Sequence, residues 1–338
     1  MKKVLIVGPE FFDYNLSIKS AFENLGWTTK VMGYHGGEVA STIERIDYHL
    51  TRDKSVFFEK KRAQFNARLL TIYKEFNPDI VFVIQASEVY KETIEQMTKS
   101  RKVLWMMDSI FRIPMAFAMR NEFDHIFLFE KTDVGRLWEE EKIRSWFLPL
   151  ALDEKVYFPT VKTNEIDILF VGALYQKRIE LLEKVCKEFA GRSIKIYGNY
   201  YSPFRRPAYH FSRKNKQSFL NKNIAPSEVN RLYNRSRICL NIHHEQSRYG
   251  VNQRFFEISG SRSFQVVDNN PFITENFSPT EVMTYVSTDD MLKKIEYVLS
   301  GNVNEQEMTE NAYQKILAGH TFTQRIKQVL ATIDNKEV

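Results

Sequence analysis

The chain has 338 residues, of which 43% are hydrophobic and 27% are charged, with a formal net charge of +6. This length favours two domains with separate cores, and the composition is that of a globular protein rather than a disordered one. No apolar run approaches the roughly 18 residues of a membrane span, and the opening run is too short for the core of a signal peptide. We therefore expect a cytoplasmic protein, in which Cys186 and Cys239 are free because each lies within an apolar pattern.

Short apolar runs alternate with helical patterns through the first half of the chain. The runs predict strands, and amphipathic spacing predicts a helix near 17–25 and a long one over 53–76. Strands that alternate with helices form a parallel sheet covered on both faces. The predicted strands lie at 3–8, 28–34, 79–84, 102–107 and 125–129.

A second series follows residues 154–165, a polar stretch with Pro159 that is typical of a linker. Its predicted strands lie at 166–172, 193–198, 237–242, 264–267 and 282–286. The tail at 320–333 has helical spacing and is expected to pack back on the first half. The sequence thus predicts an α/β fold of two doubly wound, Rossmann-like domains facing across a cleft, at 1–150 and 151–319, with the C-terminal helix in 320–338.

Candidate residues in the first half follow predicted strands. The turn at 8–13 lacks the glycines of a dinucleotide-binding loop, so a tightly bound dinucleotide is not expected. Asp13 in this turn and Asp108 after the fourth strand are expected to face the cleft. Asp108 has an alternative interpretation as the N-cap of the next helix.

In the second half, the segment VGALYQKR ends a strand and enters a helix. This places Gly172, Lys177 and Arg178 near the carboxyl end of the strand, where helix N–H groups and cations favour a diphosphate. The alternative is an exposed first helical turn with two solvated cations.

The segment GVNQRFFEISG at 250–260 is the most informative one. Helical spacing puts Arg254 and Glu257 on one face, with Asn252 at the N-terminal end. An arginine there could hold a diphosphate, and a carboxylate could bind both hydroxyls of a ribose. An ordinary surface Arg–Glu pair is the alternative.

Together, FVGALYQKR, APSEVNRLYNRSRICLNIHH, GVNQRFFEISGSRSFQVV and GHTFTQR resemble the C-terminal domain of the CgeB-like glycosyltransferases, which have the GT-B fold. The likeness covers roughly 167–325, with NQRFFE its most specific part, and a softer likeness extends into the first half through WMMD at 105–108. It implies that Arg178, Arg254 and Asn252 bind the donor diphosphate and that Glu257 binds the ribose. It also implies that Tyr197 and Gly198 lie by the base, while Asp108 and Asp13 face the sugar and the acceptor. The candidate catalytic residues are therefore Asp108, Asp13, Arg178 and Arg254.

The sequence departs from related retaining transferases in two places. Their Glu-x7-Glu pair lacks its first carboxylate here, because Tyr249 stands at that position, and the small-residue run after the helix reads Ser259 to Arg262. Retention or inversion of the anomeric centre therefore stays open. No Asp-x-Asp triplet occurs, and His243-His244-Glu245 is only a weak cluster, so no metal is expected; each of these histidines is more commonly a core or loop residue.

The sequence thus predicts a metal-independent, hexosyl-type glycosyltransferase that uses a nucleotide-sugar and no further cofactor. Its acceptor is undetermined among glycan, lipid-linked and protein molecules, as is its oligomeric state. A sugar-nucleotide epimerase of the same fold and a non-catalytic sensor of a phosphorylated ligand remain alternatives. The basic stretch at 205–222 has no recognisable nucleic-acid module, so we expect a solvated face there and no nucleic-acid partner. Charge and aromatic patches hint weakly at contact with the inner face of a membrane.

Overall fold

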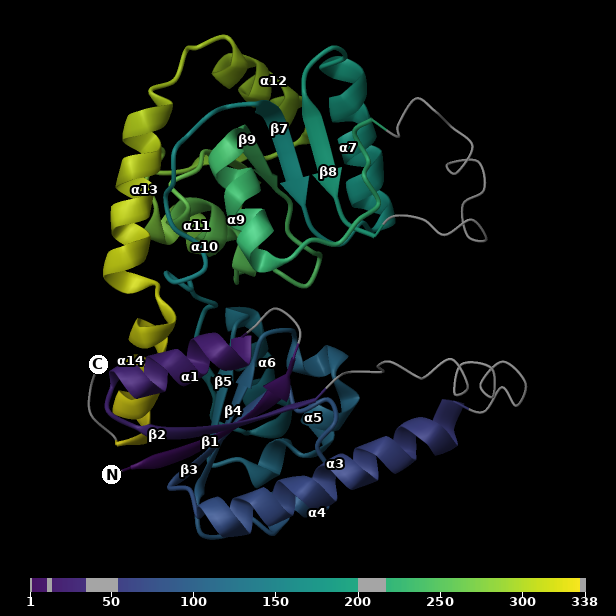
Figure 1. Ribbon diagram of the computed structural model, residues 1–338, viewed down its shortest axis with the longest axis vertical. Coiled ribbons are helices and arrows are strands. Elements are labelled where there is room, and N and C mark those ends of the chain that lie inside the picture. The colour runs from purple at the N-terminus through teal and green to yellow at the C-terminus, as the bar shows by residue number, and fades with distance from the viewer. Residues whose placement is uncertain (1, 11–13, 35–53, 200–216, 335–338) are drawn as a thin grey trace. The chain divides into compact units, whose positions relative to one another are not determined.

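A computed structural model describes residues 2–10, 14–34, 54–199 and 217–334, with side chains omitted for 54–58. The chain divides into two compact units, shown in Figure 1. Unit 1 comprises residues 1–149 and 322–338, and unit 2 comprises residues 150–321. Asp13 and most of the basic stretch at 205–222 lie outside the described residues.

Unit 1 contains a six-stranded parallel sheet in the order β2-β1-β3-β4-β5-β6. Its strands are β1 (Lys3–Pro9), β2 (Thr28–Tyr34), β3 (Ile80–Ile84), β4 (Arg101–Met106), β5 (His125–Leu128) and β6 (Trp146–Phe147). The helices are α1 (Tyr14–Asn24), α3 (Lys54–Phe76), α4 (Lys91–Glu95), α5 (Pro114–Ala118), α6 (Lys131–Glu141) and α14 (Phe322–Ile333), and the 3-10 turns are η2 (Ile110–Arg112) and η3 (Arg120–Glu122).

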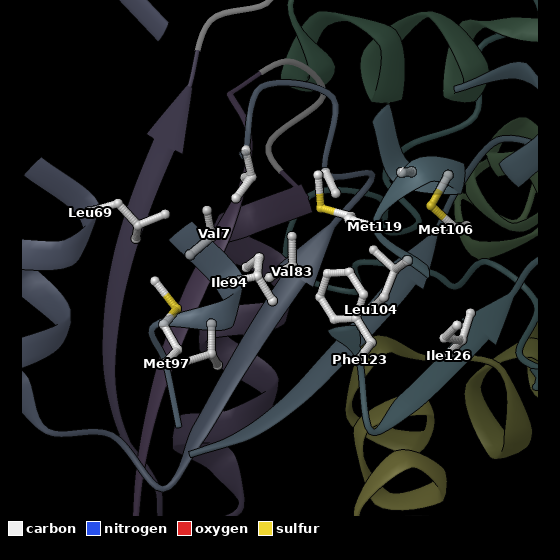
Figure 2. Close-up of a cluster of buried hydrophobic side chains, with 14 of the residues drawn as sticks. Val7, Leu69, Val83, Ile94, Met97, Leu104, Met106, Met119, Phe123 and Ile126 are labelled. Carbon is white, nitrogen blue, oxygen red and sulfur yellow. The ribbon is translucent and has the colours of Figure 1, made fainter. Parts of the chain in front are cut away.

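Both faces of this sheet are covered, which explains why its strands read as continuous apolar runs. One face forms the cluster in Figure 2, where Val7, Val83 and Leu104 pack with Leu69 of α3 and Ile94 of α4. The opposite face carries the alternate strand residues, packed against α1 and α14. There the Phe82 ring lies 5.5 Å from that of Phe22 and the Trp105 ring 5.9 Å from that of Phe322. Side-chain alternation along each strand thus supplies two cores.

The C-terminal helix α14 belongs to unit 1, where it packs against α1, which lies near the other end of the sequence. Arg325, only 1% exposed, donates from Nε to the Pro149 carbonyl at 2.9 Å. Asn24 of α1 donates to the Thr323 hydroxyl at 3.3 Å. The helix is therefore held on this face of the sheet by apolar packing and by a buried guanidinium.

Unit 2 contains a five-stranded parallel sheet in the order β11-β10-β9-β7-β8. Its strands are β7 (Ile166–Val171), β8 (Ile194–Tyr197), β9 (Ser236–Asn241), β10 (Gln265–Asp268) and β11 (Met283–Tyr285). The helices are α7 (Gln176–Glu188), α9 (Pro226–Arg235), α10 (Gln253–Gly260), α11 (Pro271–Asn276), α12 (Thr288–Leu299) and α13 (Glu305–Gly319). Alternate residues such as Ile168, Phe170 and Leu240 pack with Ile179 of α7 and Ile295 of α12.

The α/β prediction with two parallel sheets is confirmed, and each of the ten predicted strands corresponds to an observed strand within one or two residues. The sequence did not predict β6, because it has only two half-buried residues, too few for a pattern. Within the part of the chain that the structure describes, we find no helix with the length and apolarity needed to span a membrane.

Candidate functional site

The carboxyl ends of the strands in unit 2 gather a set of polar side chains. Parallel strands end at one edge of their sheet, which is where doubly wound sheets bind ligands. Arg178 of α7 follows β7, His243 follows β9, Asp268 ends β10 and Tyr285 ends β11. The helix α10, which carries Arg254 and Glu257, begins near the same edge because it follows β9.

Helix α10 begins at a well-formed cap. The side-chain oxygen of Asn252 accepts from the Phe255 amide at 3.1 Å, and its Nδ2 donates to Asn241 Oδ1 at 2.7 Å. Phe255 and Phe256 are fully buried and anchor the helix. Asn252 therefore has a structural task at the helix N-terminus, since a cap of this kind contributes about 1 kcal/mol.

Arg254 and Glu257 meet on one face of α10, as the three-residue spacing predicted. A guanidinium NH1 of Arg254 donates to Glu257 Oε2, and the Tyr233 hydroxyl lies 3.4 Å from the same oxygen. The Arg254 side chain is 22% exposed and that of Glu257 only 6%. Burial, the largest single cause, lowers the pKa of Arg254, but the charges of Glu257 and two tyrosines and the hydrogen bond to Glu257 together outweigh it and raise this pKa well above its usual value. The pair is thus a partly buried ion pair, with a buried carboxylate, rather than the surface pair considered as an alternative.

Arg178 folds back over the end of β9. It donates to the carbonyls of Ala173, at 2.8 Å, and of Ile242. Its Nε is buried, and no described residue accepts a hydrogen bond from it. Burial lowers the pKa of Arg178; the charge of Asp268 opposes this shift and that of Arg254 adds to it. Arg178 thus presents a buried, unsatisfied donor at this edge of the sheet, which a bound anion could satisfy.

Three further residues complete this cluster. His243 Nδ1 lies 2.9 Å from Asp268 Oδ1, which also accepts from the His243 amide at 2.8 Å. The Tyr285 hydroxyl and His243 Nε2 are buried, and neither has a hydrogen-bond partner among the described residues. Burial is the largest cause that raises the pKa of Tyr285, so its hydroxyl stays neutral. The sequence interpretation missed Asp268 and Tyr285 and gave His243 little weight, although each stands at a strand end, the rule that had singled out Asp108.

The remaining predicted residues of unit 2 are Lys177, Tyr197 and the two glycines Gly172 and Gly198. Lys177 forms an ion pair with Glu245, and both side chains are mostly exposed. Gly198, with φ of +151°, packs on Gly172: a Cβ added to Gly198 would lie 2.0 Å from the Gly172 carbonyl oxygen. The pKa of Tyr197 is raised chiefly by burial. The structure therefore gives Gly198 a packing reason, since a side chain cannot fit there.

In unit 1, Asp108 lies just beyond β4. Its Oδ2 accepts a hydrogen bond from Gln85 Nε2 at 2.5 Å. Ser109, not Asp108, occupies the N-cap position of the helical turn η2 that follows. The Asp108 carboxylate thus lies beside Gln85, at the edge of the unit 1 sheet where the strands end. Among the described residues, no group of three or more His, Cys, Asp or Glu side chains could hold a metal ion.

The two parallel sheets match those of solved glycosyltransferase structures with the GT-B fold. Sucrose-phosphate synthase (tll1590) from Thermosynechococcus elongatus aligns with a TM-score of 0.69 at 9% identity, over 99% of this chain and 100% of that one. HepE (Alr3699) of Anabaena, in complex with UDP-glucose, aligns at 0.66 and 8% identity over 99% and 100%. A glycosyltransferase from Rickettsia africae aligns at 0.64 and 14% identity over 98% and 97%. At such identities the likeness shows the fold.

A sequence comparison with protein families also indicates a glycosyltransferase. Residues 177–331, slightly less than half of the chain, match the family model described as glycosyl transferase-like. No curated protein sequence matches the chain. The family match and the shared fold together support a GT-B glycosyltransferase.

Proposed function

We propose that the protein transfers a hexosyl group from a nucleotide-diphosphate sugar to an acceptor, as a CgeB-like member of the GT-B glycosyltransferases, and that unit 2 binds the donor. The observation that carries this proposal is the polar cluster at the carboxyl edge of the unit 2 sheet, near the start of the helices that carry Arg178 and Arg254. In it, Arg178 Nε and the Tyr285 hydroxyl are buried and have no hydrogen-bond partner among the described residues. A buried donor without an acceptor is costly, and an anion bound there would supply the acceptors. A diphosphate has the charge and the oxygen atoms to bind both.

The reaction needs this positive charge. As the bond between the anomeric carbon and the diphosphate oxygen breaks, its electron pair leaves with the nucleoside diphosphate, and preplaced cations stabilise that charge. The buried donor atoms at Arg178 Nε and the Tyr285 hydroxyl would gain acceptors in such a complex. We propose that these guanidinium groups replace a divalent metal and that no cofactor is required. Gly172, Lys177 and Asn252 would then border the phosphates, and Glu257 the ribose.

We propose that the acceptor binds to unit 1. Asp108 is partly exposed at the carboxyl edge of that sheet. A carboxylate there can accept a hydrogen bond from the acceptor hydroxyl. If the reaction inverts the anomeric centre, the carboxylate can instead take the proton of that hydroxyl while the acceptor oxygen forms the new glycosidic bond. Asp13, which follows β1, is proposed to help orient the sugar.

The first test is nucleotide binding. Thermal unfolding is followed with UDP, GDP, TDP, CMP and pyrophosphate, each with and without EDTA. A nucleoside diphosphate at about 100 times its Kd stabilises the folded state by about 2.7 kcal/mol, or about 5–10 °C for a unit of this size. No shift with any of them would refute the proposed donor site, and a shift that EDTA abolishes would refute metal independence.

The second test separates the enzyme classes by their products. The protein is incubated with UDP-glucose and other nucleotide-hexoses, with glycan, lipid and peptide fractions as acceptors, and the products are resolved by mass spectrometry. A transferase releases the nucleoside diphosphate, whereas an epimerase gives an isomer of the donor without any acceptor. Nucleotide binding without product, unchanged in Asp108→Asn, would indicate a non-catalytic sensor.

A further inference from the structure

A rare backbone conformation ends β3 beside Asp108. Gln85 and Ala86 both have positive φ, 62° and 53°. The Ala86 amide donates to the Ile84 carbonyl at 2.7 Å, two residues back, which closes a three-residue γ-turn centred on Gln85. With positive φ at its centre, this is the rare and strained form of that turn, and neither residue is a glycine. A conformation of this kind persists only where the surroundings determine it.

Neighbouring strands hold the turn. The Tyr34 hydroxyl at the end of β2 donates to the Ile84 carbonyl at 2.8 Å and accepts from the Ser87 amide at 3.3 Å. The Gln85 amide continues the ladder with β4 by donating to the Trp105 carbonyl at 3.1 Å. Burial raises the pKa of Tyr34, so the hydroxyl remains a donor. Contacts from β2 and β4 thus fix a strained turn at the end of β3.

The turn directs a buried side chain to the candidate carboxylate. Gln85 is only 6% exposed, and its Nε2 lies 2.5 Å from Asp108 Oδ2. A strand that simply continued would place residue 85 on the sheet face opposite Ile84, in the usual alternation. The γ-turn instead brings its carboxamide to the end of β4. The strain therefore coincides with one specific contact.

We propose that Gln85 is a positioning residue that holds the Asp108 carboxylate in the orientation in which it receives the acceptor hydroxyl. The amide N–H fixes one carboxylate oxygen by donating a hydrogen bond to it. A strained element close to a reacting group is typical of preorganised sites. This role of Asp108 rests on the proposed function, whereas the hold of Gln85 on the carboxylate does not.

Two variants separate positioning from stability. Gln85→Gly keeps the positive φ without strain and removes the carboxamide; Gln85→Glu keeps the size but replaces the donor by an acceptor. Ser87→Ala, directly after the turn and in contact with Tyr34 rather than Asp108, is the matched control. The first measurement needs no substrate: carbodiimide labelling of Asp108, read by peptide mass spectrometry, together with the midpoint of thermal unfolding.

We expect labelling of Asp108 to rise about threefold or more in both Gln85 variants and to stay at the wild-type level in Ser87→Ala, because only the former release the carboxylate. The unfolding midpoint of Gln85→Gly should lie within about 2 °C of the wild type, since relief of strain offsets the lost contact. Unchanged labelling, or a fall in the midpoint like that of a truncated core residue, would show that the turn serves stability alone and overturn the inference.

The second measurement is transfer from the nucleotide-hexose identified by the product screen, or its hydrolysis with water as the acceptor. We expect kcat to fall about tenfold in both Gln85 variants with the donor KM unchanged, and no further fall when Gln85→Gly is added to Asp108→Asn. Wild-type kcat in Gln85→Gly would overturn the inference. A wild-type protein that neither transfers nor hydrolyses any nucleotide-hexose would refute the proposed function instead, and the labelling result would still decide whether Gln85 holds Asp108.

Discussion

Replacement of Arg254 by alanine tests the strongest electrostatic feature of unit 2. The substitution leaves the Glu257 carboxylate, with a side chain only 6% exposed, without its counter-charge. Removal of one partner from a buried ion pair costs about 3–5 kcal/mol. Because the Arg254 side chain is 22% exposed, water screens part of the interaction, and we expect the lower end, about 3 kcal/mol. For a unit of this size, that lowers the unfolding midpoint by about 6–12 °C.

The assay is urea and thermal unfolding of Arg254→Ala beside the double variant Arg254→Ala/Glu257→Gln. A neutral amide at 257 removes the unpaired charge and can still bond to the Tyr233 hydroxyl, which lies 3.4 Å from the present carboxylate. We expect the double variant to recover about 2 kcal/mol of the loss, because replacing both partners is far less costly than removing one. If Arg254→Ala unfolds with wild-type stability, or the double variant is no better, the account of a buried pair is refuted.

The same two variants separate folding from ligand binding. If Arg254 also binds the diphosphate, UDP affinity measured by calorimetry falls about tenfold or more in both variants, since a hydrogen bond to a charged group contributes about 1.5–3 kcal/mol. Affinity that returns together with stability in the double variant would assign Arg254 a purely structural role.

Three further predictions concern packing and buried groups. Gly198→Ala should destabilise unit 2 by about 3 kcal/mol or more in urea unfolding, because its Cβ would overlap a backbone oxygen at 2.0 Å; Gly135→Ala, with no atom within 4 Å, should be neutral or stabilising. Arg325→Lys should cost about 1–3 kcal/mol, since a buried carbonyl loses the Nε donor, and an unchanged midpoint would contradict this. Burial raises the pKa of Cys239 to about 12, so iodoacetamide at pH 8 should label it only after unfolding, whereas the partly exposed Cys186 should react sooner. In the folded protein, alkylation of Cys239 should increase only as the pH approaches that value. Rapid labelling of Cys239 at pH 8 would contradict its burial.

The strands could be predicted because a strand that is buried on both faces needs apolar residues at every position. Runs such as IVFVI in β3 are apolar at every position, and all five residues are buried. The pairing of Arg254 with Glu257 was also accessible, because three residues along a helix face are neighbours by geometry. Both inferences depend only on local periodicity.

The rest of the site depends on contacts between distant segments. His243 and Asp268 are 25 positions apart and meet only because β9 and β10 are neighbours in the sheet. Nothing in the residues around Gln85 indicates positive φ, since the turn is imposed by Tyr34, 51 positions earlier, and by β4. Local patterns thus reveal elements, whereas strand order decides which strand ends lie side by side.

The two units depart from well-satisfied packing at corresponding places. In unit 2 the departure consists of buried atoms of Arg178, His243 and Tyr285 that find no partner among the described residues. In unit 1 it is a strained turn at Gln85, beside Asp108. Buried polar atoms without a partner also occur elsewhere among the described residues, at His125 and Asp133 for example, so one such atom does not mark a site. What distinguishes these two places is that the departures lie at strand ends beside candidate residues, where doubly wound sheets bind ligands and where sequences are expected to give up local agreement for function. Each unit by itself therefore favours a ligand-binding edge, without any assumption about how the units are arranged.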